Sequence, residues 1–218
     1  MRFTNLLRKL AGVVLPLSLT ACVTLFDAPE DQVSAPVPAS AKPATVETPP
    51  MSPESRVAYE RALAALKAGR FTDAERELTT LALREPRFAG PHANLGILYH
   101  RTGRAVQAVE ALDRAIRLNP ERAAYHNELG LVHRNEGRFA EARQAYVRAI
   151  ELDPNYAYAH LNLGILYDIY LQDGEKAMPH YERYKALVPA ESATVAKWIA
   201  DLKQRARTAD QTKGGKNG

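Results

Sequence analysis

Apolar and polar residues recur with helical spacing along much of the chain, for example in the segment 106–118, VQAVEALDRAIRL. Residues three and four positions apart share one face of an α-helix, so this segment predicts an amphipathic helix. The predicted core face consists of Val106, Ala108, Val109, Ala111, Leu112, Ala115 and Ile116, and the predicted solvent face of Glu110, Asp113, Arg114 and Arg117.

The pattern returns every 34 residues. The hexapeptide NLGILY occupies 94–99 and 162–167, and a looser copy, NELGLVH, lies midway at 127–133. A second marker keeps nearly the same step, since prolines end the apolar runs at Pro86, Pro120, Pro154 and Pro189. A fixed period of this length is typical of stacked supersecondary units.

These repeats resemble the tetratricopeptide repeat (TPR) family, whose units are paired antiparallel helices. The second repeat matches the family pattern at His92, Leu95, Gly96, Tyr99, Gly103, Ala108, Leu112, Ala115 and Pro120. The third repeat matches it equally well, and the fourth contains one extra residue before Gly174. In the first, Arg61 and Ala62 replace the Leu-Gly pair. The resemblance implies an all-α fold: a TPR solenoid of about four helix-turn-helix repeats at 54–189.

Glycines stand inside three of the predicted helices, at Gly96, Gly130 and Gly164. Glycine in a helix interior costs about 1 kcal/mol relative to alanine. Its regular recurrence therefore predicts that a neighbouring helix approaches too closely for a side chain.

A stack of such repeats needs a cap, because each helix pair leaves an apolar face uncovered. The segment 192–206 places Val195, Trp198, Ile199 and Leu202 on one face. We therefore expect a capping helix at 190–208, followed by a disordered basic tail at 209–218.

The first 21 residues predict a secretory signal peptide. Arg2, Arg8 and Lys9 precede an apolar stretch at 10–19, which is too short for a membrane span of roughly 20 residues.

Cys22 is the only cysteine of the chain, so no intramolecular disulfide can form. Together with Leu19, Thr20 and Ala21 it resembles a bacterial lipobox, which implies lipidation of Cys22 and a lipid anchor in the membrane. Val23 in the next position resembles outer-membrane sorting, and implies the periplasmic face of the outer membrane. The alternative is an ordinary cleaved signal peptide with an unmodified Cys22.

The segment 22–53 is expected to form the lipidated N-terminus and a tether. Seven of the chain's fourteen prolines fall within 27–53, with little that could join a core. A Pro-rich recognition motif is the alternative to a simple spacer.

The charge distribution argues against nucleic acid as a partner. The net charge of the chain is +4, but the basic excess lies at the two ends. Residues 22–202 carry 21 basic and 24 acidic residues. The folded body is therefore not a basic surface.

Three histidines, His92, His126 and His160, recur at the repeat period, which raises the hypothesis of metal ions bound along the stack. Equivalent positions in adjacent repeats lie about 8–10 Å apart, which is too far for shared coordination. The family resemblance assigns this position to packing. Because the sequence also contains no phosphate loop and no catalytic constellation, we expect no enzyme activity, no cofactor and no metal site.

Function is expected on the groove that TPR stacks build from the first helix of each pair. Asparagine side chains there can hydrogen-bond to the backbone of an extended peptide, and arginines can bind a carboxylate. The apolar side chains can form pockets for the side chains of the peptide. The predicted partner-binding residues are Asn94, Ile97, Arg101, Asn127, Leu131, Arg134, Tyr158, Asn162, Ile165 and Ile169. For the asparagines, local hydrogen bonding within the protein is the alternative.

The layout of lipobox, tether, repeats and capping helix is similar to that of pilotin-like lipoproteins of type IV and tight-adherence pili. It implies an envelope scaffold that binds a protein or peptide and helps a pilus or secretin complex to assemble. The alternative is an adaptor that recruits peptidoglycan hydrolases or proteases. The sequence leaves the oligomeric state open.

Overall fold

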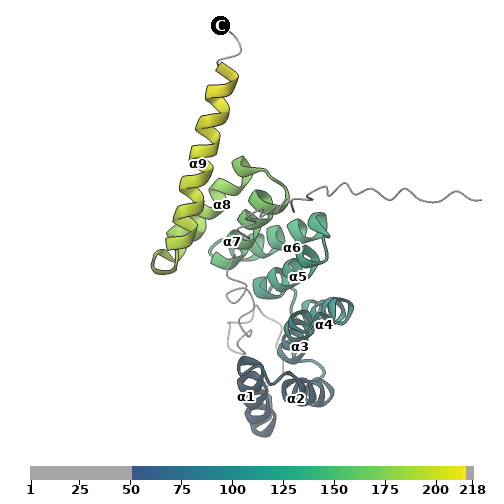
Figure 1. Cartoon of the computed structure of the whole chain (residues 1–218). Coiled ribbons are helices and arrows are strands. Elements are labelled where there is room, and N and C mark those ends of the chain that lie inside the picture. Colours follow the sequence, from purple (N-terminus) through teal and green to yellow (C-terminus); the bar gives the residue numbers. More distant parts are fainter. Residues whose placement is uncertain (1–50, 215–218) are drawn as a thin grey trace, which may run out of the picture. The chain divides into compact units, whose positions relative to one another are not determined.

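The computed structural model describes residues 51–214, with side chains through Thr208, and every regular element in this range is helical (Figure 1). The first four helices are α1 (Pro53–Lys67), α2 (Phe71–Arg84), α3 (Ala89–Arg101) and α4 (Ala105–Leu118). They are followed by α5 (Ala123–Asn135), α6 (Phe139–Leu152), α7 (Ala157–Ile165), the π-helical turn η2 (Leu166–Tyr170) and α8 (Gly174–Leu187). A short 3₁₀ turn, η3 (Pro189–Glu191), leads into α9 (Ala193–Gly214).

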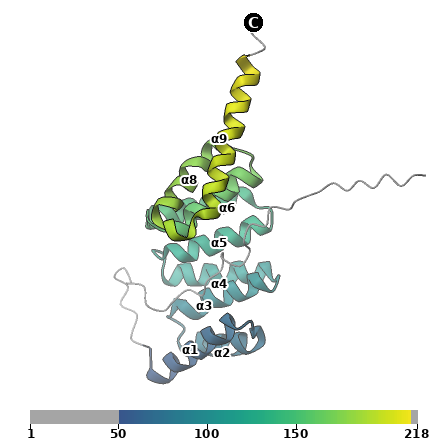
Figure 2. The ribbon, with the colours of Figure 1, turned by 60° about the vertical axis from the view of Figure 1, so that its left-hand side comes forward.

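The helices form four consecutive hairpins, α1–α2, α3–α4, α5–α6 and α7–α8, which lie next to one another in chain order (Figure 2). The first helix of each hairpin also contacts the first helix of the next one, whereas contacts between successive second helices are absent or slight. The first helices α1, α3, α5 and α7 therefore lie on the inner side of the stack. This arrangement confirms the predicted all-α solenoid.

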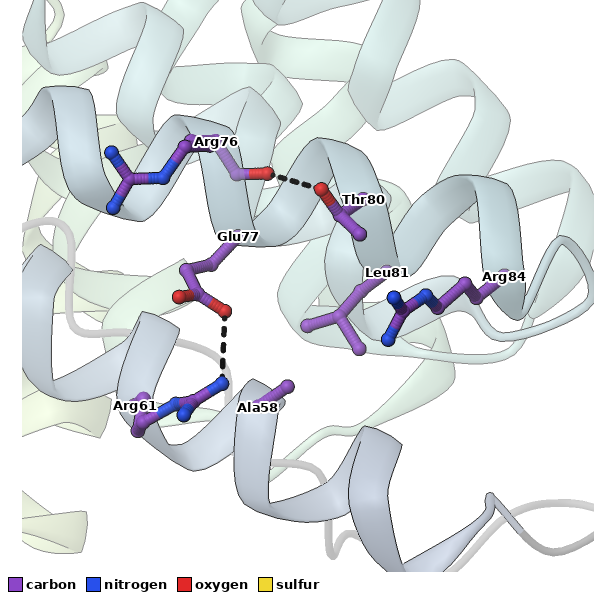
Figure 3. Close-up of a pocket in the computed structure, with 7 residues that line it drawn as sticks. All are labelled: Ala58, Arg61, Arg76, Glu77, Thr80, Leu81 and Arg84. Atoms are coloured by element: carbon purple, nitrogen blue, oxygen red, sulfur yellow. Dashed lines mark hydrogen bonds and ion pairs between the residues drawn. The ribbon is translucent and has the colours of Figure 1, made fainter.

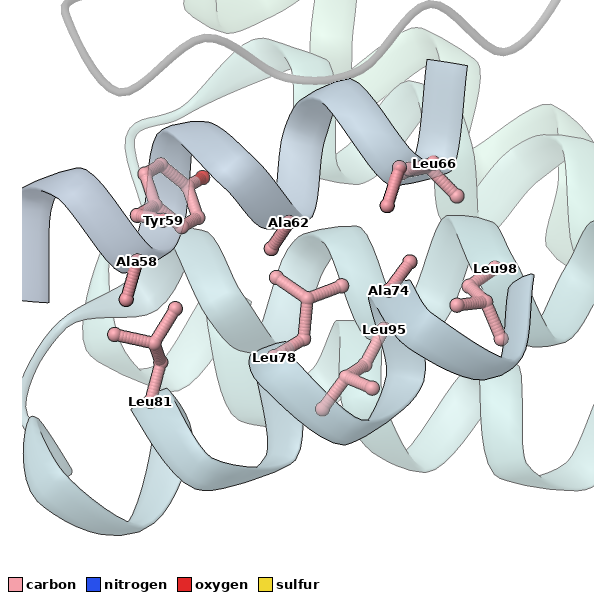
Figure 4. Packing of buried hydrophobic residues seen from close by; sticks show 10 residues of the cluster. Ala58, Tyr59, Ala62, Leu66, Ala74, Leu78, Leu81, Leu95 and Leu98 are labelled. Atoms are coloured by element: carbon pink, nitrogen blue, oxygen red, sulfur yellow. The ribbon is translucent and has the colours of Figure 1, made fainter. Parts of the chain in front are cut away.

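One leucine position joins each hairpin to the hairpin before it. Leu95 of α3 belongs to the apolar cluster that contains Ala74 and Leu78 of α2 (Figure 4). Leu129 and Leu163 pack in the same way on α4 and on α6. Burial of such a side chain contributes about 1.5–3 kcal/mol, so the leucines hold successive hairpins together.

The helix glycines allow the two helices of a hairpin to approach each other closely, as predicted. A Cβ atom on Gly96 would lie 2.5 Å from Leu112, one on Gly130 would lie 2.5 Å from the ring of Tyr146, and one on Gly164 would lie 2.6 Å from the ring of Tyr181. Because these distances are far below van der Waals contact, a side chain at these positions would force the neighbouring helix or its side chain to shift.

The departures of the first repeat from the TPR pattern follow from its position at the end of the stack. Arg61 occupies the position of Leu95, but no hairpin precedes α1 among the described residues. Its guanidinium instead lies 3.4 Å from the carboxylate of Glu77, which occupies the position of Ala111. The outer face of the first hairpin therefore carries an ion pair where the later hairpins carry apolar residues, as suits the terminal unit of a repeat array.

The extra residue of the fourth repeat is accommodated in η2. The Leu171 amide donates to the Leu166 carbonyl at 3.0 Å, a bond that spans five residues. The first three hairpins turn at Gly69, Gly103 and Gly137, each with φ between 71° and 73°. After the π turn, Gln172 takes this place with φ 53°.

Two expectations from the sequence need correction. The capping helix packs through Val195, Ile199 and Leu202, as expected, but α9 extends to Gly214, six residues into the predicted disordered tail. Val106 does not belong to the core face of α4, since 74% of it is exposed. It lies in the first turn of the helix, where the neighbouring hairpin does not cover it.

The signal peptide, the Cys22 lipobox and nearly all of the tether lie outside the described residues. Within the described part of the chain, no helix has the length and apolar character that crossing a membrane requires.

We predict that Gly130→Ala lowers the free energy of unfolding by about 1–3 kcal/mol, because the added methyl group would overlap the buried ring of Tyr146. In a Tyr146→Leu background the same change should cost less, because the first hairpin already combines Ala62 with Leu78 in these two positions. Urea denaturation of the four variants measures both values. Equal costs in the two backgrounds would contradict the packing argument.

We predict that Gln172→Gly raises the free energy of unfolding by about 0.5–1 kcal/mol, because it removes the cost of a left-handed L-residue and adds the smaller entropic cost of glycine. Gln172→Ala keeps the strained backbone and serves as the control, with little change expected. Thermal and urea denaturation give the comparison, and a loss of stability with glycine would show that the Gln172 side chain is needed.

Candidate functional site

The ten residues predicted to bind a partner lie on α3, α5, α7 and the adjoining turn η2. These elements belong to the inner row of first helices, in which α3 contacts α5 and α5 contacts α7. The structure therefore brings the predicted residues to one side of the stack. Their role in binding a partner stays a prediction.

Six of the ten are buried. Ile97, Leu131 and Ile165 are equivalent positions of successive repeats, and all three belong to the apolar clusters between helices. Asn94, Asn127 and Asn162 are at most 1% exposed. Their side chains contribute to the floor of the inner face.

The asparagine amides form lateral hydrogen bonds between successive first helices. The Nδ2 of Asn94 donates to the Tyr59 hydroxyl at 2.7 Å and to the Gly90 carbonyl at 3.0 Å. The Nδ2 of Asn162 donates to the Oδ1 of Asn127 at 2.9 Å. Both side-chain pairs are 35 residues apart in the sequence, so the amides cross-link neighbouring repeats. This agrees with the alternative that these asparagines serve the protein's own structure.

Glu128 is an inner-face residue that the sequence pattern did not single out. A step of 34 residues leads from Asn94 to Glu128 and from Glu128 to Asn162, so Asn127 is one position out of register. Glu128 is only 4% exposed. Asn94, Glu128 and Asn162 each directly precede the Leu-Gly pair of their repeat, whereas Asn127 lies one residue earlier. Alignment on the Leu-Gly pair would therefore have singled out Glu128.

The other four predicted residues lie at the accessible part of the inner face or beside it. Arg101 is exposed, with its guanidinium carbon 5.4 Å from the centroid of the Phe71 ring. Ile169 in η2 is 48% exposed. A guanidinium over an aromatic ring is held in place while its N–H groups stay available as donors.

Tyr158 is half-buried between two other tyrosine rings, those of Tyr156 at 6.4 Å and Tyr184 at 6.3 Å between centroids. Burial raises the pKa of the Tyr158 hydroxyl, and the neighbouring Glu191 raises it further. The phenol is therefore neutral at physiological pH and presents a flat amphipathic surface.

Arg134 combines a fixed position with unused donors. Its guanidinium carbon lies 5.6 Å from the centroid of the Tyr170 ring. The Nε and Nη1 of Arg134 and the Oδ1 of Asn162 are shielded from solvent and have no hydrogen-bond partner within the described residues. A shielded polar group without a partner costs about 1–3 kcal/mol, and a ligand would reach these atoms only after a local side-chain rearrangement.

The recurring histidines have a structural role in the last two repeats. The Nε2 of His126 lies 2.9 Å from the Pro120 carbonyl, and that of His160 lies 3.1 Å from the Pro154 carbonyl. Burial lowers the pKa of His92, His126 and His160, which favours the neutral rings. No three potential metal ligands of the His, Cys, Asp and Glu types cluster anywhere in residues 51–208.

A shallow hollow of about 230 Å³ lies between α1 and α2 (Figure 3), away from the predicted residues. Its lining is polar, and two of its arginines are already in ion pairs, Arg61 with Glu77 and Arg76 with Asp73. Nothing in this lining resembles a catalytic group arrangement. The hollow is lined by Ala58, Arg61, Arg76, Glu77, Thr80, Leu81 and Arg84.

The architecture of stacked helical hairpins with an inner row of first helices defines a helical-repeat scaffold. Three overlapping segments, 59–123, 95–157 and 127–192, match the sequence profile described as tetratricopeptide repeat. Together they span more than half of the chain, which belongs to the tetratricopeptide repeat family. No curated protein sequence matches the chain significantly.

Solved structures share the fold. TTC0263, a TPR protein of Thermus thermophilus, is 24% identical with a TM-score of 0.60, over 69% of this chain and 81% of that one. MamA is 21% identical with a TM-score of 0.54, over 69% of this chain and 96% of that one. The pilF protein of Pseudomonas aeruginosa is 25% identical with a TM-score of 0.65, over 71% of this chain and 70% of that one.

We predict that Asn162→Ala lowers the free energy of unfolding by about 1–3 kcal/mol, because it leaves the buried Oδ1 of Asn127 without its donor. Asn127→Ala should have a similar effect, and the double variant should cost less than the sum of the two. Urea denaturation of all three variants gives the coupling energy. Strictly additive effects would contradict a direct bond between these side chains.

Proposed function

We propose that the chain is a membrane-anchored periplasmic TPR scaffold that binds a protein or peptide partner along its inner face. The observation that supports this most is the pair of inner-face arginines, Arg101 and Arg134, whose guanidinium groups lie over aromatic rings. The TPR fold generally serves protein–protein interaction, and the proposal assigns the chain no catalytic step.

The chemistry of the accessible residues favours an extended segment with acidic groups. Arg101 and Arg134 each carry N–H donors and are fixed over aromatic rings, so they suit carboxylates. Tyr158 and Ile169 add apolar contact area on α7 and η2. The buried apolar residues Ile97, Leu131 and Ile165 support these groups from below.

The proposed membrane anchor rests on the sequence. Cys22 in its lipobox context would carry the acyl chains, and Val23 favours the outer membrane, with the repeats facing the periplasm. The Pro-rich tether 22–53 would let the repeats act at a distance from the bilayer.

We further propose that the scaffold assists the assembly or localisation of a pilus or secretin complex. The similarity of fold to pilF supports this, as does the layout shared with pilotin-like lipoproteins. The second candidate is an adaptor that recruits peptidoglycan hydrolases or proteases, which the same inner face would suit.

We predict that Arg101→Ala combined with Arg134→Ala in the chromosomal gene reduces secretin multimers and surface pili to the level of a gene deletion. Each arginine would lose a charge-assisted hydrogen bond worth about 1.5–3 kcal/mol, which is tenfold or more in affinity. Arg143→Ala, which changes an exposed arginine on α6 away from the inner face, is the matched control and should leave assembly intact. Detergent-resistant multimers on gels and electron microscopy of pili are the measurements.

Intact multimers and pili in the deletion strain would exclude the assembly role. The adaptor role would then be favoured if a wall hydrolase crosslinks to the wild-type protein but not to the double variant.

Anchoring is tested separately. Cys22→Ser should move the protein from the membrane fraction to the soluble periplasm, and the mass of the acyl chains should be missing from its mass spectrum.

A further inference from the structure

The fourth hairpin brings two histidines together that lie 20 residues apart in the sequence. His160 is on α7 and His180 on α8, and their Nδ1 atoms are 3.3 Å apart. The ring centroids are 5.5 Å apart, with 36° between the ring planes. His160 is 8% exposed, whereas His180 is half-buried, so the pair can be reached from one side.

The surrounding groups fix the protonation pattern of His160. Its Nε2 lies 3.1 Å from the Pro154 carbonyl, which can only accept a hydrogen bond. The Nε2 therefore carries the proton, and the Nδ1 that faces His180 has a free lone pair. A backbone carbonyl that holds the far nitrogen of an imidazole is the usual outer-shell support of a histidine metal ligand.

The spacing of the two Nδ1 atoms fits coordination of one ion. Zn²⁺ binds imidazole nitrogen at about 2.0–2.1 Å, so two ligands 3.3 Å apart subtend an angle of about 105° at the metal, close to tetrahedral. We propose that His160 and His180 form a two-histidine site for a single Zn²⁺ or a similar late transition-metal ion, with the remaining coordination positions open to water.

The protonation equilibria of the pair are compatible with this site. Burial lowers the pKa of His160, and burial together with the nearby His160 lowers the pKa of His180 to about 4. Both rings are therefore neutral at pH 7, as metal ligands must be.

Charges of both signs lie near the pair. Arg183 acts on His160 against the opposite effect of Asp153. Tyr167 stacks on His180 with ring centroids 5.9 Å apart, and Lys176, which faces the Tyr167 ring, is held by Asp173. Arg183 is therefore a positive charge that opposes a cation at this position, and its guanidinium donates to the neutral Oδ1 of Asn155.

The other repeats offer a matched control. His126 contacts the Pro120 carbonyl just as His160 contacts that of Pro154. The position equivalent to His180, allowing for the residue inserted in η2, is Ala145 in the third repeat. The third repeat therefore has one half of the arrangement, and His180→Ala restores a residue that this position already holds elsewhere in the chain.

The test is a Zn²⁺ titration of the full chain, purified in detergent without a polyhistidine tag, by calorimetry at pH 7. We expect one saturable site, at least tenfold weaker in His180→Ala and in His160→Gln and changed less than twofold in His126→Ala. Ala145→His should create a second site of similar affinity that the added change His126→Ala removes. Imidazole ¹⁵N spectra should show the Nδ1 shifts of His160 and His180 on binding, and circular dichroism shows whether each variant is folded.

Equal binding by the wild-type chain and by a folded His180→Ala variant would overturn the proposal, and so would the absence of saturable binding. The pair would then be a simple hydrogen bond in which the Nδ1 of His180 donates to that of His160. Since the titration needs no partner protein, its outcome is independent of the scaffold role.

Discussion

The fold depends on the burial of an apolar stripe that no single hairpin can cover. Leu95, Leu129 and Leu163 each belong to a first helix, and each finds its apolar partners on the second helix of the preceding hairpin. The stack is therefore held together by contacts between neighbouring hairpins. At each of its two ends, an apolar face would be left uncovered without a cap or a polar substitution. At one end Arg61 and Glu77 replace apolar residues with an ion pair, and at the other Val195, Ile199 and Leu202 of α9 cover α8.

Lateral hydrogen bonds join adjacent first helices, between Asn94 and Tyr59 and between Asn162 and Asn127. Within the hairpins, glycine allows Tyr146 and Tyr181 to lie against the helix backbone. The row of first helices also carries Arg101 and Arg134 over aromatic rings, so the side chains that stabilise the inner face and those suited to a partner occupy neighbouring positions.

The π turn contains a residue that joins the fourth hairpin to the capping helix. Asp168 is 6% exposed, and its carboxylate accepts from Arg205 of α9 at 2.8 Å and from the Tyr181 hydroxyl at 3.4 Å. In the third repeat the equivalent position is Arg134, whose neighbouring Tyr146 hydroxyl has no hydrogen-bond partner among the described residues. The last repeat is in this way specialised for ending the stack.

The sequence alone determined the repeat period, the helical hairpins and the close approach at Gly96, Gly130 and Gly164, because each follows from local spacing along one helix or from its recurrence. It also located the extra residue before Gly174. Only the tertiary structure decided the partners across helices: Asn94 with Tyr59, Asn127 with Asn162, and His160 with His180. For the two pairs between first helices the reason is geometric, since adjacent first helices pack with an offset that pairs residues 35 positions apart, whereas the sequence repeats every 34. The histidines lie on the two helices of one hairpin, 20 residues apart. Burial of Glu128 and exposure of Val106 likewise depend on which neighbour covers a position, and the pattern along one helix does not contain that information.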